Sequence, residues 1–205
     1  MRKVFVVLVL LALSTAAHAG LPVLVWSDGF ELGLGNWMFV NPSGDGTATS
    51  AAVQSYSSTQ GTVVPCEGLW MAQIYKENGG LAELISIPIE TVPGQLYEID
   101  VCVGGLGMWD NCGFRWNKWG YINGGAEIWV GDNFRNVNPL QCNIGWSFTA
   151  AGSTAQVLLG LDRACRDGNG QSAFFDHVVV STIPEPGSLF VLAGGLLGLV
   201  IRRRK

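Results

Sequence analysis

The chain has 205 residues, 48% of them hydrophobic and 14% charged, with a formal net charge of −4. Residues 20–183 are the right size for one domain with a sizeable core. They contain six Lys or Arg against fifteen Asp or Glu, which gives this segment a net charge of −9. An acidic domain repels phosphate backbones, which argues against a nucleic-acid partner.

The chain begins with a segment typical of an export signal. Arg2 and Lys3 precede an apolar run at 4–13, and the Ala-His-Ala sequence at 17–19 has the pattern of small residues that signal peptidase recognises. We therefore expect residues 1–19 to be a signal peptide that the Sec export machinery uses. The alternative, an uncleaved anchor, is disfavoured because the apolar run is too short to span a bilayer comfortably.

The hydrophobic residues of the central segment alternate with a period of two. In QLYEIDVCV, Tyr97, Ile99, Val101 and Val103 share one face, as in a half-buried strand. No stretch is typical of an amphipathic helix, and about nine or ten such runs predict an all-β, antiparallel jelly-roll sandwich. The polar segment SGDGTATSAAVQSYSSTQGT, residues 43–62, fits either a long loop or an edge strand. Further runs are found at PVLVW (22–26), NWMFV (36–40), GLWMAQIY (68–75), LAELISI (81–87), AEIWV (126–130), GWSFT (145–149), AQVLLGL (155–161) and AFFDHVVV (173–180).

The last 22 residues combine a proline-rich triplet, an apolar run and a basic end. A helix over residues 188–201 would measure about 21 Å against a hydrocarbon core of about 30 Å, so it is a marginal transmembrane span. Cations after it can reach the headgroups and should stay in the cytoplasm. The triplet is Pro184, Glu185 and Pro186, and the cations are Arg202, Arg203, Arg204 and Lys205.

This arrangement resembles the PEP-CTERM sorting signal of exopolysaccharide-producing Gram-negative bacteria. The resemblance implies a precursor held in the inner membrane by residues 184–205, then processed near the Pro-Glu-Pro triplet by an exosortase. The product would be delivered to the cell surface or the extracellular matrix. A eukaryotic lipid-anchor signal is disfavoured, because its hydrophobic end would carry no charge.

Three segments resemble galactose-binding-like jelly rolls, a fold that includes many carbohydrate-binding modules. They are WSDGFELGLGNW at 26–37, VPGQLYEIDV at 92–101 and AFFDHVVV at 173–180, where His177 departs from the usual pattern. The resemblance implies a structural calcium ion with Glu31 and Asp176 as carboxylate ligands, completed by other oxygens. The alternative is that both carboxylates form only surface hydrogen bonds.

Aromatic residues gather in the glycine-rich segment CVGGLGMWDNCGFRWNKWGYINGG, residues 102–125. Their rings could stack on sugar rings while nearby polar groups bind the hydroxyls. The glycines favour a loop, where tryptophans are hard to bury. The alternatives are that individual rings fill the core, or that Arg115 and Lys118 stack on them. We therefore expect a carbohydrate-binding site at Trp109, Trp116, Trp119 and Tyr121.

Five cysteines lie in the exported segment, where disulfides can form, and one of them must be left over. Spacing favours a short loop closed by Cys102 and Cys112, with Cys142 and Cys165 as a second pair. The fifth is Cys66. A zinc site is disfavoured, because no Cys-x2-Cys pair exists and His177 is the sole histidine after residue 19.

Catalytic motifs are absent from the sequence. There is no Gly-x-Ser-x-Gly elbow, although two of the many carboxylates could in principle form a glycosidase pair. We therefore expect a non-catalytic surface or matrix protein that binds exopolysaccharide. A structural or adhesive protein-binding component is the alternative, and a glycan-processing enzyme is less favoured.

Overall fold

The computed structural model describes residues 22–42, 44, 46–51, 56–58, 61–76, 79–106, 115–132, 140–163 and 170–183. All regular secondary structure within these ranges is β, arranged as two six-stranded sheets and one short hairpin. Every strand pair in the two sheets is antiparallel. The expected all-β sandwich is therefore confirmed.

One sheet, which we call sheet A, has the strand order β12-β9-β14-β6-β3, with β1 also paired to β14. Its long central strand β14 pairs with β9 along nearly its whole length, while its other edge is shared by β6 and then β1. The strands are β1 (Val23–Asp28), β3 (Gly46–Ala51), β6 (Met71–Lys76), β9 (Leu96–Leu106), β12 (Gln141–Thr149) and β14 (Gln171–Thr182).

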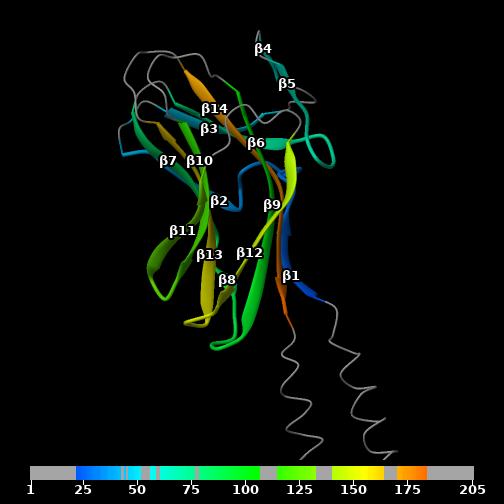
Figure 1. The fold of residues 1–205 in the computed structure, drawn as a ribbon, viewed down its shortest axis with the longest axis vertical. Coiled ribbons are helices and arrows are strands. Elements are labelled where there is room, and N and C mark those ends of the chain that lie inside the picture. Colours follow the sequence, from blue (N-terminus) through cyan, green and yellow to red (C-terminus); the bar gives the residue numbers. More distant parts are fainter. Residues whose placement is uncertain are drawn as a thin grey trace, which may run out of the picture.

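The second sheet, sheet B, has the order β11-β10-β13-β7-β2, with β8 also paired to β13. Its strands are β2 (Trp37–Val40), β7 (Gly80–Ser86), β8 (Ile89–Glu90), β10 (Arg115–Asn123), β11 (Ala126–Asp132) and β13 (Thr154–Arg163). The separate hairpin consists of β4 (Tyr56–Ser58) and β5 (Gly61–Val63). The hairpin lies at one end of the sandwich, and β1 begins and β14 ends at the opposite end (Figure 1).

The main core lies between the two sheets and follows the predicted alternation. Tyr97, Ile99, Val101 and Val103 of β9 are all buried in it, so the predicted inward face of this strand is confirmed. Sheet B contributes alternate residues of β13, such as Leu159, to the same cluster.

Two segments differ from the simplest expectation. In the polar segment, residues 43–62, strand β3 forms an edge of sheet A, as one of the two predictions for this segment has it. The β4–β5 hairpin follows it. The glycine-rich aromatic segment is not one loop, because β9 extends to Leu106 and β10 begins at Arg115. Successive residues of β10 therefore alternate between the two faces of the strand, and Trp119 and Tyr121, two positions apart, share one face.

Candidate functional site

Trp119 and Tyr121 lie on the face of β10 that packs into the core. Trp119 is only 7% exposed and belongs to the main hydrophobic cluster, so its assignment to a sugar-binding surface is wrong. Tyr121 is half-buried and stacks on Phe148 of sheet A with a centroid separation of 4.6 Å. Trp109 lies outside the described residues, as does the side chain of Trp116.

A different tryptophan, Trp129 of β11, lies on the outer face of sheet B. It pairs with Gly120 of β10, on the side of the sheet opposite to Trp119. The far edge of its indole ring reaches β13, where a Cβ added at Gly160 would lie 3.0 Å from Trp129 Cη2. A glycine at position 160 thus leaves the space in which this half-buried ring lies.

Charged side chains surround this ring. Lys118 Nζ lies 5.7 Å from the Trp129 ring centroid and forms an ion pair with Asp162 Oδ2 at 2.9 Å. Glu83 of β7 pairs with Gly160 of β13, and its side chain is only 7% exposed. Burial raises the pKa of Glu83, as does the nearby charge of Glu127, while Lys118 opposes the change.

Among the side chains that the structure describes, the outer face of sheet B around Trp129 therefore combines an aromatic ring with three carboxylates and one ammonium group. A flat apolar surface beside a few placed polar groups is the arrangement with which proteins bind small polar ligands such as sugars. Sequence reasoning missed Trp129 because AEIWV has the pattern of an ordinary strand. Only the strand pairing shows that Trp129 lies beside Gly120 of β10 and near Gly160 of β13.

Glu31 and Asp176 both bind the segment that precedes β6. Glu31 Oε1 accepts hydrogen bonds from the backbone N–H groups of Leu69 and Trp70 at 2.7 and 3.0 Å. Asp176 Oδ2 accepts them from Cys66 and Glu67 at 2.6 and 3.1 Å. The two carboxylates, far apart in sequence, thus anchor the same loop, residues 66–70.

These contacts do not fit a calcium site well. Calcium requires six to eight oxygen ligands, whereas both carboxylates here accept hydrogen bonds from amide N–H donors. Among the described residues, no group of three potential metal ligands includes Glu31 or Asp176. The calcium ion stays a prediction from the family resemblance.

Asp176 lies where β14 changes neighbours from β6 to β1. Its side chain is fully buried, and burial raises its pKa to about 6 although three backbone N–H groups, including that of His177, favour the charged form. His177 has a φ of 49° at a break in the β9–β14 register, a left-handed conformation in which histidine is several-fold enriched. Its Nδ1 lies 2.9 Å from Glu67 Oε2.

The disulfide differs from both predicted pairs. Cys142 of β12 is bonded to Cys66, across a sequence separation of 76 residues, so its pairing with Cys165 is wrong. Cys102 is buried and lies in no disulfide, so its pairing with Cys112 is wrong as well. Cys112 and Cys165 themselves lie outside the described residues. Sequence spacing failed because the bonded cysteines are 76 residues apart and come together only in the folded chain.

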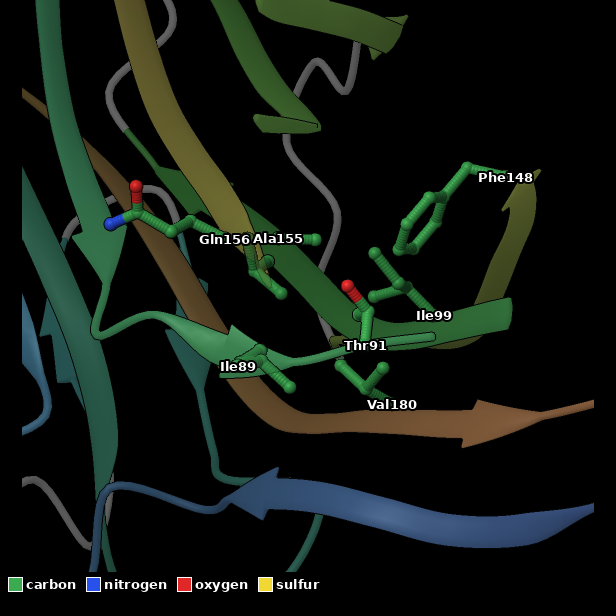
Figure 2. A pocket seen from close by; sticks show the side chains of 8 residues that line it. Ile89, Thr91, Ile99, Phe148, Ala155, Gln156 and Val180 are labelled. Carbon is green, nitrogen blue, oxygen red and sulfur yellow. The ribbon is translucent and has the colours of Figure 1, made fainter. Parts of the chain in front are cut away.

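A small crevice opens between the two sheets at the end where β8 lies. Figure 2 shows apolar side chains, including Ile99, Phe148 and Val180, directed toward one another there. The space is too narrow to hold a water molecule, so it is a gap in the packing rather than a ligand site.

The sorting segment and the signal peptide fall outside the described residues, including Pro184, Glu185, Pro186, the expected span at 188–201 and the basic end at 202–205. No helix long and apolar enough to cross a bilayer occurs in the part of the chain that the structure describes.

Residues 182–205 match the PEP-CTERM protein-sorting motif, so the chain carries this motif at its C-terminus. A comparison with curated protein sequences finds no match.

Several solved structures share the fold. The CBM22-1 and GH10 modules of Clostridium thermocellum xylanase 10B, complexed with xylohexaose, align with a TM-score of 0.53 and 13% identity over 79% of this chain and 29% of that chain. The Stig cyclase Fisc from Fischerella sp. TAU aligns with a TM-score of 0.50 and 16% identity, over 82% of this chain and 94% of that chain.

The enzymatically active domain of bacteriophage CBA120 tailspike protein 4 aligns with a TM-score of 0.53 and 10% identity, over 78% of this chain and 22% of that chain. The chain thus spans less than a third of the tailspike and xylanase chains. At these identities the likeness establishes the fold alone, a jelly-roll sandwich.

Proposed function

We propose that this protein is an exported, exosortase-processed surface or matrix protein whose sandwich binds a neutral glycan on the outer face of sheet B. The sorting part of the proposal rests on the match at residues 182–205 and on the signal-like start of the chain. The host is then a Gram-negative bacterium, and the precursor is tethered in its inner membrane until the tail is removed.

The glycan-binding part rests on one observation, the half-buried Trp129 ring that lies against Gly160 beside Lys118 and Asp162. Sugar rings have apolar faces that stack on aromatic rings, and the neighbouring charged groups can bind their hydroxyls. The xylanase that shares the fold was solved with xylohexaose, a neutral oligosaccharide, which makes this ligand class a natural first probe.

The charge of the face favours a neutral sugar. Of the charged side chains described near Trp129, Glu83, Glu127 and Asp162 supply carboxylates and Lys118 supplies an ammonium group, within a domain that is itself strongly acidic. An acidic polysaccharide would be repelled at low salt, whereas a neutral one would meet hydrogen-bond acceptors without a charge penalty.

Retention on polysaccharides tests the binding site. The full chain, purified in detergent, should be retarded in gels that contain the host's own polysaccharide or neutral xylan, and less so by a polyuronate. Trp129→Ala should lose about 2 kcal/mol of binding, roughly 30-fold in affinity, because central aromatic anchors typically carry that much.

Trp70→Ala provides a matched control, since Trp70 lies in the loop before β6 and on another part of the domain. This variant should bind like the unmodified chain. Equal retention of Trp129→Ala and Trp70→Ala would refute the site, and so would a lack of retention of the unmodified chain on every neutral glycan.

A glycan-processing activity is the second candidate, because Glu83 and Asp162 place two carboxyl groups on the same face of sheet B. Burial raises the pKa of Glu83, and a carboxyl group with a raised pKa can act as an acid. Asp162, in an ion pair with Lys118 on the same face, would be the second carboxylate that glycoside hydrolysis requires. Release of reducing ends from the bound glycan, lost in Glu83→Gln, would favour the enzyme. Stable retention without product favours the binding role.

Cell fractionation with intact-mass analysis tests the sorting. The chain should reach the surface or medium without residues 1–19 and without its basic end, whereas Glu185→Ala should accumulate in the inner membrane. A cytosolic product with both ends intact would refute export, whatever the domain binds.

A further inference from the structure

Three cysteine sulfurs from three different segments meet on the outer side of sheet A. Cys66 precedes β6, Cys102 lies in β9 and Cys142 lies in β12. Cys66 and Cys142 form a disulfide, and all three Sγ atoms lie within 4.8 Å of one another. The thiol of Cys102 therefore lies close to both sulfurs of the existing disulfide.

The strand register explains why Cys102 is so near to Cys142. Gln141 pairs with Val103 and Ile144 pairs with Val101, so residues 142 and 143 of β12 both lie opposite the single residue Cys102. This is a β-bulge, and Cys142 lies in it, opposite Cys102 of the neighbouring strand β9. Opposed residues of neighbouring antiparallel strands have Cα atoms about 4.5–5.5 Å apart, a separation that a disulfide can bridge.

The three sulfurs differ in access to solvent. Cys142 is exposed and Cys66 is half-buried, whereas Cys102 is 1% exposed and packs in a small apolar cluster separate from the main core. A thiol from solution thus reaches Cys142 first and does not reach Cys102 directly. The other members of this cluster are Val63, Met71, Leu140 and Phe174.

We propose that Cys66, Cys102 and Cys142 form a thiol–disulfide exchange site, in which Cys102 can take the place of Cys66 as the partner of Cys142. An external thiolate attacks Cys142 Sγ, and the bonding electrons leave with Cys66 Sγ, which takes a proton from water. Cys102 then loses its proton to water and attacks Cys142 Sγ, and the external thiolate departs. One disulfide is present before and after, so no net oxidant or reductant is consumed.

The product would carry a Cys102–Cys142 disulfide between β9 and β12 and a thiol at Cys66. Loop 66–70 would lose its covalent tie, but Asp176 and Glu31 would still hold its backbone N–H groups. Cys66 would then be a site for modification by a small disulfide or by another exported thiol protein, in a compartment where such reagents occur. This inference is independent of the proposed glycan site.

Disulfide mapping tests the proposal. The full-length chain is equilibrated in a buffer of reduced and oxidised glutathione at mildly alkaline pH, quenched with acid and alkylated. Trypsin and Asp-N then separate all five cysteines, because Asp-N cleaves before Asp110, between Cys102 and Cys112. We expect two linkages in the unmodified chain, Cys66–Cys142 and Cys102–Cys142. Finding only the first, at every incubation time, would overturn the proposal.

Two variants sharpen the test. Cys66→Ser should form the Cys102–Cys142 linkage, whereas Cys102→Ser should retain Cys66–Cys142 as its sole linkage among these three positions. If folded Cys66→Ser instead presents both remaining cysteines as alkylated thiols, the proposal is wrong. Should Cys66→Ser fail to fold, the measurement on the unmodified chain decides by itself.

Discussion

Gly131→Ala provides a direct test of the assignment of Trp119 to the core. Gly131 pairs with Trp119 across β10 and β11, and a Cβ added at Gly131 would overlap Cε2, Cζ2 and Nε1 of the Trp119 ring. The ring cannot easily move away, because it is 7% exposed and packed among other buried side chains. Overpacking of this kind typically costs about 1–3 kcal/mol of unfolding free energy.

For a domain of this size, that loss corresponds to a fall in Tm of about 2–12 °C. Thermal and urea unfolding of the purified chain measure it. Gly152→Ala is the matched control, since a Cβ there has nothing within 4 Å, and it should change the unfolding free energy by less than about 0.5 kcal/mol. If the two variants unfold alike, Trp119 is not held in the core as described.

Two further predictions concern the anchors of loop 66–70. The pKa of Asp176 is raised from 3.8 to about 6, so its contribution to stability is present below pH 3.8 and is lost as the pH rises through 6. The difference in unfolding free energy between the unmodified chain and Asp176→Asn should therefore change by about 3 kcal/mol across that range, and a difference that does not vary with pH would contradict the prediction. Glu31→Gln removes a charged acceptor of two N–H groups and should cost about 1 kcal/mol. Limited proteolysis should then cut loop 66–70 faster than in the control Glu90→Gln, and equal cleavage rates would show that Glu31 does not hold the loop.

Local sequence patterns are sufficient to identify the class of fold and the sorting motif. Period-two alternation identifies half-buried strands locally, because successive side chains of a strand point to opposite faces. It correctly predicts that Tyr97, Ile99 and Val101 face the core. The Pro-Glu-Pro triplet, apolar run and basic end are contiguous, so no folding is needed to recognise the sorting motif.

The residues of the candidate site, in contrast, depend on how the strands pair. Alternation places Trp116 and Trp119 on opposite faces of β10, but it cannot tell which face meets the other sheet. The pairing of β10 with β11 and β13 buries Trp119 and leaves Trp129 on the outer face. The disulfide likewise depends on the tertiary fold, which brings Cys66 to Cys142 across a sequence separation of 76 residues. Such contacts are non-local, because they depend on how whole strands pair rather than on the spacing of residues along the chain.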